Sequence, residues 1–305
     1  MIRWKIVVHA FIDGFSRLVT GIRASNNNWA ETVLDLFLDL IEVHGIPSRL
    51  RGDHGTENLL VAAWIEEFRG VERGSYIWGR CVLCNTMLRT VVTKFTRSVH
   101  NIRIERLWRD FTSGIGMKWK ELFQSLEHHD GLDADSDAHI WLLHRLFLSA
   151  INQDLLEWAE TWNSHTLSIH GERQRSPRDM FVFGMLQNGV RGLDAAQYEP
   201  VDEDIDDLSS YGIDWEDYDD HQILSHHHES NGVNQDPTIN PFLPHPPTTF
   251  SHVEVEEPDC PLTSEQLLIV DNLVEQSYIS GRRSIDDYRS LWIAALHVCQ
   301  QMPLS

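Results

Sequence analysis

The sequence predicts a mixed α/β fold in which a β-sheet is flanked by helices, because strand-like and helix-like patterns alternate along its first third. Residues 5–12 (KIVVHAFI) are apolar and β-branched, which is typical of a buried strand. The turn signal Asp13-Gly14 and a second strand-like run, residues 16–23, follow, so the two runs form a predicted hairpin. With 42% apolar residues, the chain can bury a substantial core.

A helix, a short strand and a second helix are predicted after the hairpin. Asn28 is a candidate N-cap, with Glu31 as its capping-box partner three residues later, and Gly45 ends the first helix. A short strand is predicted near 47–51, and the second helix near 57–68.

The pattern is irregular over residues 73–99, and helical spacing returns from about residue 101. Two further helices are predicted near 138–150 and 154–163. This order extends the mixed α/β pattern into a helical second half.

The charge of the chain is concentrated in one segment. The formal net charge is −21, yet residues 1–192 hold 22 Lys/Arg and 23 Asp/Glu, whereas residues 193–260 hold 18 acids and no Lys or Arg. We therefore predict an acidic, disordered linker over 193–260, followed by a small helical C-terminal unit at 261–303 that Thr263 or Ser264 caps. Net charge then says little about what the near-neutral first part binds.

No apolar run approaches the ~20 residues that a membrane-spanning helix requires, and the N-terminus lacks the pattern of a signal peptide. Four scattered cysteines do not form a disulfide scaffold in a chain of 305 residues. We expect a reduced, intracellular protein.

Asp53 and Glu105 are the candidate catalytic residues. Metal-dependent phosphoryl transfer needs carboxylates that converge on divalent ions, and Mg²⁺ prefers hard oxygen ligands. Asp53 follows a predicted strand and Glu105 lies on a predicted helix, which suits such a site. Taken alone, however, an Asp in a turn is usually a turn-former and a helical Glu is usually solvated.

Several motifs occur together and in order: IDGFSRLV, RLRGDHGTEN, SVHNIRIERLWRDF and WNSHTLSIHGERQRSPRDMF. Over about residues 1–185 they resemble the integrase core domain, a family related to retroviral integrases and DDE transposases. The resemblance implies an integrase core at 1–190 with a ribonuclease-H-like mixed sheet flanked by helices. It also implies a triad of two Asp and one Glu, Mg²⁺ (or Mn²⁺) as cofactor, and DNA as partner. A homo-oligomer and nuclear localisation are further expectations.

Matched to the family motifs, Asp53 corresponds to the second acid and Glu105 to the third, so both are expected to be catalytic and metal-binding. Asn58 and Asn101 accompany these motifs and are expected to shape the site. Three arginines beside Glu105 either contact DNA phosphates or are ordinary solvated helix residues, namely Arg103, Arg106 and Arg109.

The first acid departs from the family pattern. Asp13 is too close to Asp53 in sequence, and the family's first acid would lie on a strand upstream of Met1. We therefore interpret Asp13 as a turn residue, with a metal ligand as the alternative. If the first acid is missing, catalysis should fall by orders of magnitude.

Residues 81–97 interrupt a motif that would otherwise join GSYIWGR directly to SVHNIRIERLW. Three explanations remain open: a retained intron, which we favour, a genuine loop insertion, or a zinc module. The zinc module would use Cys81 and Cys84, but the chain lacks a second close cysteine pair.

Two functions follow from these patterns. One is an enzyme for DNA polynucleotidyl transfer that uses two divalent metal ions. The other is a non-catalytic module, derived from a transposable element, that binds nucleic acid or protein. A further hypothesis is that the acidic segment covers the DNA-binding face by mimicking DNA.

Overall fold

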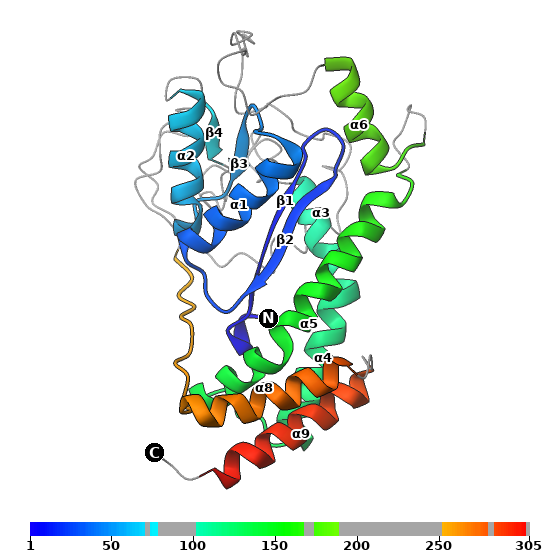
Figure 1. The fold of residues 1–305 in the computed structure, drawn as a ribbon. Coiled ribbons are helices and arrows are strands. Elements are labelled where there is room, and N and C mark those ends of the chain that lie inside the picture. The colour runs from blue at the N-terminus through cyan, green and yellow to red at the C-terminus, as the bar shows by residue number, and fades with distance from the viewer. Residues whose placement is uncertain (71–73, 79–101, 168–173, 189–251, 280–283, 303–305) are drawn as a thin grey trace, which may run out of the picture.

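The computed structural model confirms a mixed α/β protein (Figure 1), and it describes residues 1–70, 74–78, 102–167, 174–188, 252–279 and 284–302. The insertion at 81–97, with both of its cysteines, lies outside the described residues, as do Asn101 and most of the acidic segment. Within the described part, no helix is both long enough and apolar enough to span a membrane.

The predicted hairpin is present. A short 3₁₀ turn, η1 (Ile2–Trp4), leads into β1 (Val7–Ile12), which pairs antiparallel with β2 (Val19–Ser25). The backbone N–H of Asp13 donates to the carbonyl of Leu18 at 2.8 Å and closes the connection. The turn signal in the sequence therefore located this element correctly.

Helix α1 (Ala30–His44) packs against β2 and ends at Gly45, whose φ of 81° favours glycine, as predicted. The predicted N-cap was wrong. The cap position is Trp29, and no side chain caps the helix there. Instead the Asn27 side chain accepts hydrogen bonds from the Trp29 N–H at 3.3 Å and the Thr32 hydroxyl at 2.6 Å.

The chain continues through β3 (Leu50–Gly52), the 3₁₀ turn η2 (Thr56–Asn58), α2 (Leu59–Arg69) and β4 (Tyr76–Trp78). Strand β4, which the sequence pattern did not predict, pairs parallel with β3. A buried cluster of apolar side chains joins α1, α2 and β4. Leu50 of β3 packs against this cluster.

In the described residues the strands form two separate two-stranded sheets, β1–β2 and β3–β4. The two pairs differ in direction, one antiparallel and one parallel. The ribonuclease-H-like arrangement of a single sheet stays a prediction.

The second half is helical, with α3 (Ile102–Phe111), α4 (Met117–His129) and α5 (Asp137–Ser164), and a π-helical turn joins α3 to α4. The two helices predicted over 138–163 are in fact this single helix α5. The larger buried cluster packs α3, α4 and α5 against the hairpin, and α6 (Pro177–Asn188) extends beyond α5.

Two C-terminal helices, α8 (Ser264–Ile279) and α9 (Ile285–Gln301), lie against the ends of α4 and α5 (Figure 1). Thr263 caps α8: its hydroxyl accepts from the Gln266 N–H at 3.4 Å, and its own N–H donates to Gln266 Oε1 at 2.9 Å. Before α8, residues 252–262 run as an extended segment along the side of the core.

Candidate functional site

The carboxyl end of β3 positions Asp53. Leu50 N–H donates to the Ser75 carbonyl at 2.8 Å, and β3 then pairs with β4 in parallel register, Gly52 opposite Trp78. Asp53 follows the last strand residue and is exposed. The pairing therefore places this carboxylate at the edge where both strands end.

Asn58 holds the Asp53 carboxylate. Its Nδ2 donates to Asp53 Oδ1 at 2.7 Å, and its own backbone N–H donates to the Gly55 carbonyl at 3.2 Å. The short turn η2 thus brings a residue five positions later back onto the acid. This amide donor fixes the orientation of the Asp53 carboxylate, as a metal site requires.

Glu57 is a second carboxylate at this place, and the sequence reasoning missed it. Burial raises the pKa of the Glu57 carboxyl, and the charge of Asp53 raises it further. A hydrogen bond to its own backbone, the Asn28 side chain and the charge of His252 all oppose this shift. The available signal was a second acid in RGDHGTEN, four residues after the first.

The buried Tyr76 side chain lies next to Gly52, at the end of β3. Burial raises the pKa of its hydroxyl well above the usual value, and the charges of Asp53 and Glu57 act in the same direction. The hydroxyl therefore stays protonated. The ring packs against Trp78 with centroids 4.5 Å apart, and Trp78 in turn meets the ring of His54.

Helix α3 carries Glu105 and the three candidate phosphate-binding arginines. Leu107 is fully buried and anchors the helix in the core, and α3 packs against β1. The backbone of Arg103 and Glu105 is described but their side chains are not. Arg106 is half-buried, and Arg109 Nε makes a 3.3 Å ion pair with Asp110.

The Asp13 carboxylate accepts hydrogen bonds within the hairpin turn. Its Oδ2 accepts hydrogen bonds from the N–H groups of Phe15 at 3.2 Å and Ser16 at 2.7 Å, and from the Ser16 hydroxyl at 2.7 Å. Arg17, with a φ of 63°, completes the turn. This geometry is the one expected of a turn-forming aspartate.

The described side chains do not by themselves complete a metal site. Among them, no group of three or more His, Cys, Asp or Glu residues could hold an ion. Asp53 is the exposed carboxylate at this edge, and the raised pKa of Glu57 makes it a poorer ligand. A complete site would need further carboxylates beside Asp53.

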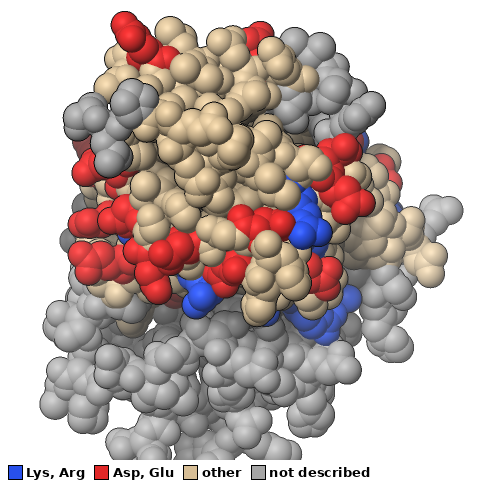
Figure 2. Space-filling view, turned by 90° about the horizontal axis from the view of Figure 1, so that it is seen from below, with Lys and Arg blue, Asp and Glu red and all other residues tan. Residues whose placement is uncertain are grey.

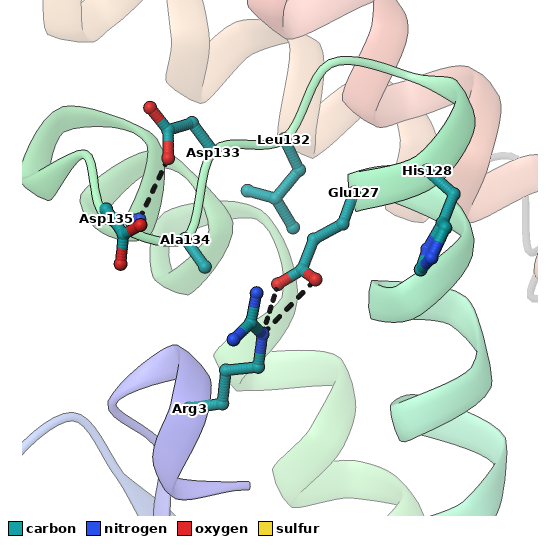
Figure 3. Close-up of a pocket in the computed structure, with 7 residues that line it drawn as sticks. All are labelled: Arg3, Glu127, His128, Leu132, Asp133, Ala134 and Asp135. Carbon is teal, nitrogen blue, oxygen red and sulfur yellow. Dashed lines mark hydrogen bonds and ion pairs between the residues drawn. The ribbon is translucent and has the colours of Figure 1, made fainter.

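A pocket elsewhere offers no competing site. It lies near the start of the chain and the loop between α4 and α5 (Figure 3), where Arg3 Nε contacts both oxygens of Glu127 at 2.9 and 3.2 Å. Because this guanidinium already has a carboxylate partner, the pocket does not present an unpaired cation to an anionic ligand.

The face formed by α8 and α9 is also unsuited to nucleic acid. Seen from below, its charged side chains are mostly acidic (Figure 2). Exposed acids on these helices include Glu265, Glu275 and Asp286. Such a face would repel a phosphate backbone.

Fold and site together define a mixed α/β protein with an amide-held carboxylate where two parallel strands end. The sequence model of the integrase core domain family matches residues 1–97 and 83–195, so the chain belongs to this family. The two matched segments overlap within the interval where the insertion is predicted. Neither a search of curated proteins nor a search of solved structures gave a match.

Proposed function

We propose that this chain is an integrase-type core that acts on DNA by polynucleotidyl transfer. The observation that carries the proposal is the placement of Asp53 at the end of β3, held by Asn58, within a chain of the integrase core family. The ribonuclease-H-like fold and the roles of Asp53 and Glu105 as ligands of Mg²⁺ (or Mn²⁺) belong to this proposal. DNA as substrate, a homo-oligomer and nuclear localisation belong to it as well.

The reaction exchanges one P–O bond for another. The oxygen of water (hydrolysis) or of a DNA 3′-hydroxyl (strand transfer) gives up its proton to solvent and forms a bond to phosphorus, while the bridging P–O bond of the phosphodiester breaks and the departing oxygen takes up a proton. Two bound divalent ions would supply charge neutralisation for the attacking and leaving oxygens.

The residues of this chain would orient and shield that centre. Asn58 fixes the direction of the Asp53 carboxylate, and the Tyr76 hydroxyl, which stays protonated, adds no negative charge beside it. Arg106 would meet phosphates beside the scissile bond.

We expect the 305-residue chain to be catalytically impaired. Asp13, the alternative candidate for a metal ligand, has its carboxylate engaged by the hairpin turn. That leaves Asp53 and Glu105 as the matched acids, and two carboxylates neutralise less metal charge than three.

The test is Mg²⁺-dependent nicking of supercoiled DNA by the full chain and by Asp53→Asn, with Asp35→Asn as a control at an exposed carboxylate on α1. Any nicking by the parent chain should fall at least ~100-fold in Asp53→Asn and stay unchanged in Asp35→Asn. Equal nicking by all three proteins would contradict the assignment.

A second candidate function is a non-catalytic binding module, which the engagement of Asp13 in the turn favours. Its signature would be DNA binding without nicking, with an affinity that Asp53→Asn leaves unchanged. Measuring the DNA affinity of the same three proteins separates the two functions.

A further inference from the structure

Residues 252–259, here called the strap, dock beside the candidate site. The Asn28 side chain donates to the Val253 carbonyl at 3.1 Å, and the Asn28 backbone N–H donates to the Val255 carbonyl, also at 3.1 Å. The Thr56 hydroxyl lies 2.9 Å from His252 Nδ1. The strap therefore bridges the start of α1 and the turn η2.

These contacts place the strap close to the candidate carboxylates. Thr56 is the first residue of η2, whose last residue holds Asp53, and the charge of His252 is felt by Glu57. From there the strap continues along the core toward α8 (Figure 1). Glu257 is near enough to His144 of α5 to influence its pKa.

The strap is strongly acidic and holds to the core through few side chains. Val255 is 5% exposed and Pro258 is buried, but the strap's four acids are all exposed: Glu254, Glu256, Glu257 and Asp259. It contains no Lys or Arg. An extended segment with so little buried apolar surface opens locally at low cost.

We propose that the strap is an intramolecular cover that keeps nucleic acid from the candidate site until it is displaced. This inference rests on the proposed function, because it takes DNA as the ligand. A phosphate backbone that approached Asp53 would meet the exposed acids of the strap, and like charges at close range repel. Displacement of the strap would remove that repulsion and expose Asn28 and Thr56.

The apparent DNA affinity is the affinity of the released state multiplied by the fraction of molecules in which the strap is released. A change that undocks the strap should therefore tighten DNA binding without touching any residue of the candidate site. Val255→Ser is such a change, since it replaces a buried apolar side chain with a polar one. Val253→Ser is the matched control, because Val253 is 45% exposed and contributes only its carbonyl.

The experiment uses the full chain and a short fluorescein-labelled DNA duplex at fixed ionic strength. Hydrogen exchange of the Asn28 amide, which donates to Val255, reports whether the strap is docked. We expect Val255→Ser to speed this exchange and to lower the Kd for DNA about tenfold, with Val253→Ser unchanged in both. If Val255→Ser perturbs the whole fold, His252→Ala undocks the other end of the strap, where it meets Thr56.

Faster Asn28 exchange with an unchanged Kd overturns the cover while leaving the proposed function intact. Absence of DNA binding by all proteins, even at low salt, overturns the proposed function and the cover with it. A charge-only variant, Glu254→Gln with Glu256→Gln, separates repulsion from occlusion. It should tighten DNA binding mainly at low salt, where screening is weak, without faster exchange at Asn28.

Discussion

Gly52 has no side chain at a point where the Tyr76 ring fills the available space. A Cβ built at Gly52 would lie 1.9 Å from the Tyr76 hydroxyl oxygen and 3.0 Å from the ring carbon that carries it. Because Tyr76 is buried, its ring cannot move aside to make room for a side chain at position 52. This close approach fixes the end of β3 and therefore the position of Asp53.

Gly52→Ala should destabilise the protein by about 1–3 kcal/mol through overpacking. Tyr76→Phe removes the nearest atom, so the double variant Gly52→Ala/Tyr76→Phe should recover part of that loss. Urea unfolding of the two single variants and the double variant measures the coupling between the sites. Strict additivity of the two changes would argue against the contact.

Substitutions at Asp13 can distinguish a turn-forming residue from a metal ligand. Asp13→Asn keeps a side-chain oxygen that can accept the turn hydrogen bonds, whereas Asp13→Ala removes it. We expect a stability loss of about 1–3 kcal/mol in Asp13→Ala and a smaller loss in Asp13→Asn. Titration with Mg²⁺ should be unaffected by either change, and weaker Mg²⁺ binding in Asp13→Asn would support the ligand alternative instead.

Among elements, α5 stabilises β2 through amide side chains along the strand. Asn163 accepts from the Val19 N–H at 2.8 Å and donates to the Val19 carbonyl at 3.0 Å. Asn152 makes the same pair of bonds with Ala24, at 2.8 and 3.0 Å. The helix thus satisfies backbone groups that a neighbouring strand would otherwise satisfy, which protects the strand from pairing with another chain.

Asn163→Leu should cost about 1–3 kcal/mol, because it leaves two buried backbone groups of Val19 without these partners. Gln153→Ala is the control on the same helix, since Gln153 is exposed and should change stability by less than ~0.5 kcal/mol. Thermal unfolding of both variants tests the difference, and equal losses would show that the amide contacts contribute little.

At the scale of the whole molecule, the C-terminal helices are joined to the core. Arg289 of α9 contacts both oxygens of Asp130 at 2.5 and 2.8 Å, and the Trp292 indole N–H donates to the Asp130 carbonyl at 3.0 Å. Tyr288 and Trp292 are buried in the main apolar cluster. A sequence distance of more than 150 residues separates these partners.

Stability should fall as the pH drops below about 6.5, because two buried histidines resist protonation. Burial lowers the pKa of His144, and the charge of Lys5 acts in the same direction, while a hydrogen bond to Trp4 and the charge of Glu257 oppose. Burial also lowers the pKa of His9. Each folded pKa lies below its unfolded value, so the unfolded state binds more protons in that window.

His144→Gln should flatten this dependence in part, since glutamine can still donate to the Trp4 carbonyl but does not titrate. Urea midpoints measured from about pH 7.5 to about pH 5.5 test the slope. A slope identical to that of the parent chain would show that His144 is not responsible.

The sequence by itself determined the local elements and the candidate acid. An apolar, β-branched run and a turn signal predicted the hairpin, and helical spacing predicted α1 and its stop at Gly45, because these depend on short-range sterics and on which residues are apolar. The motif around Asp53 identified the acid that ends β3, and the same motifs identified the integrase core family. The catalytic and metal-binding roles of Asp53 and Glu105 remain predictions.

Only the tertiary structure decided what depends on partners distant in the chain. The pattern did not show that Asn28 binds the strap rather than capping α1, or that Asn152 and Asn163 of α5 bind the backbone of β2. Each depends on which groups compete for the same hydrogen bonds and on what burial costs an unpaired polar group. Such competition is settled only when segments far apart in the sequence meet.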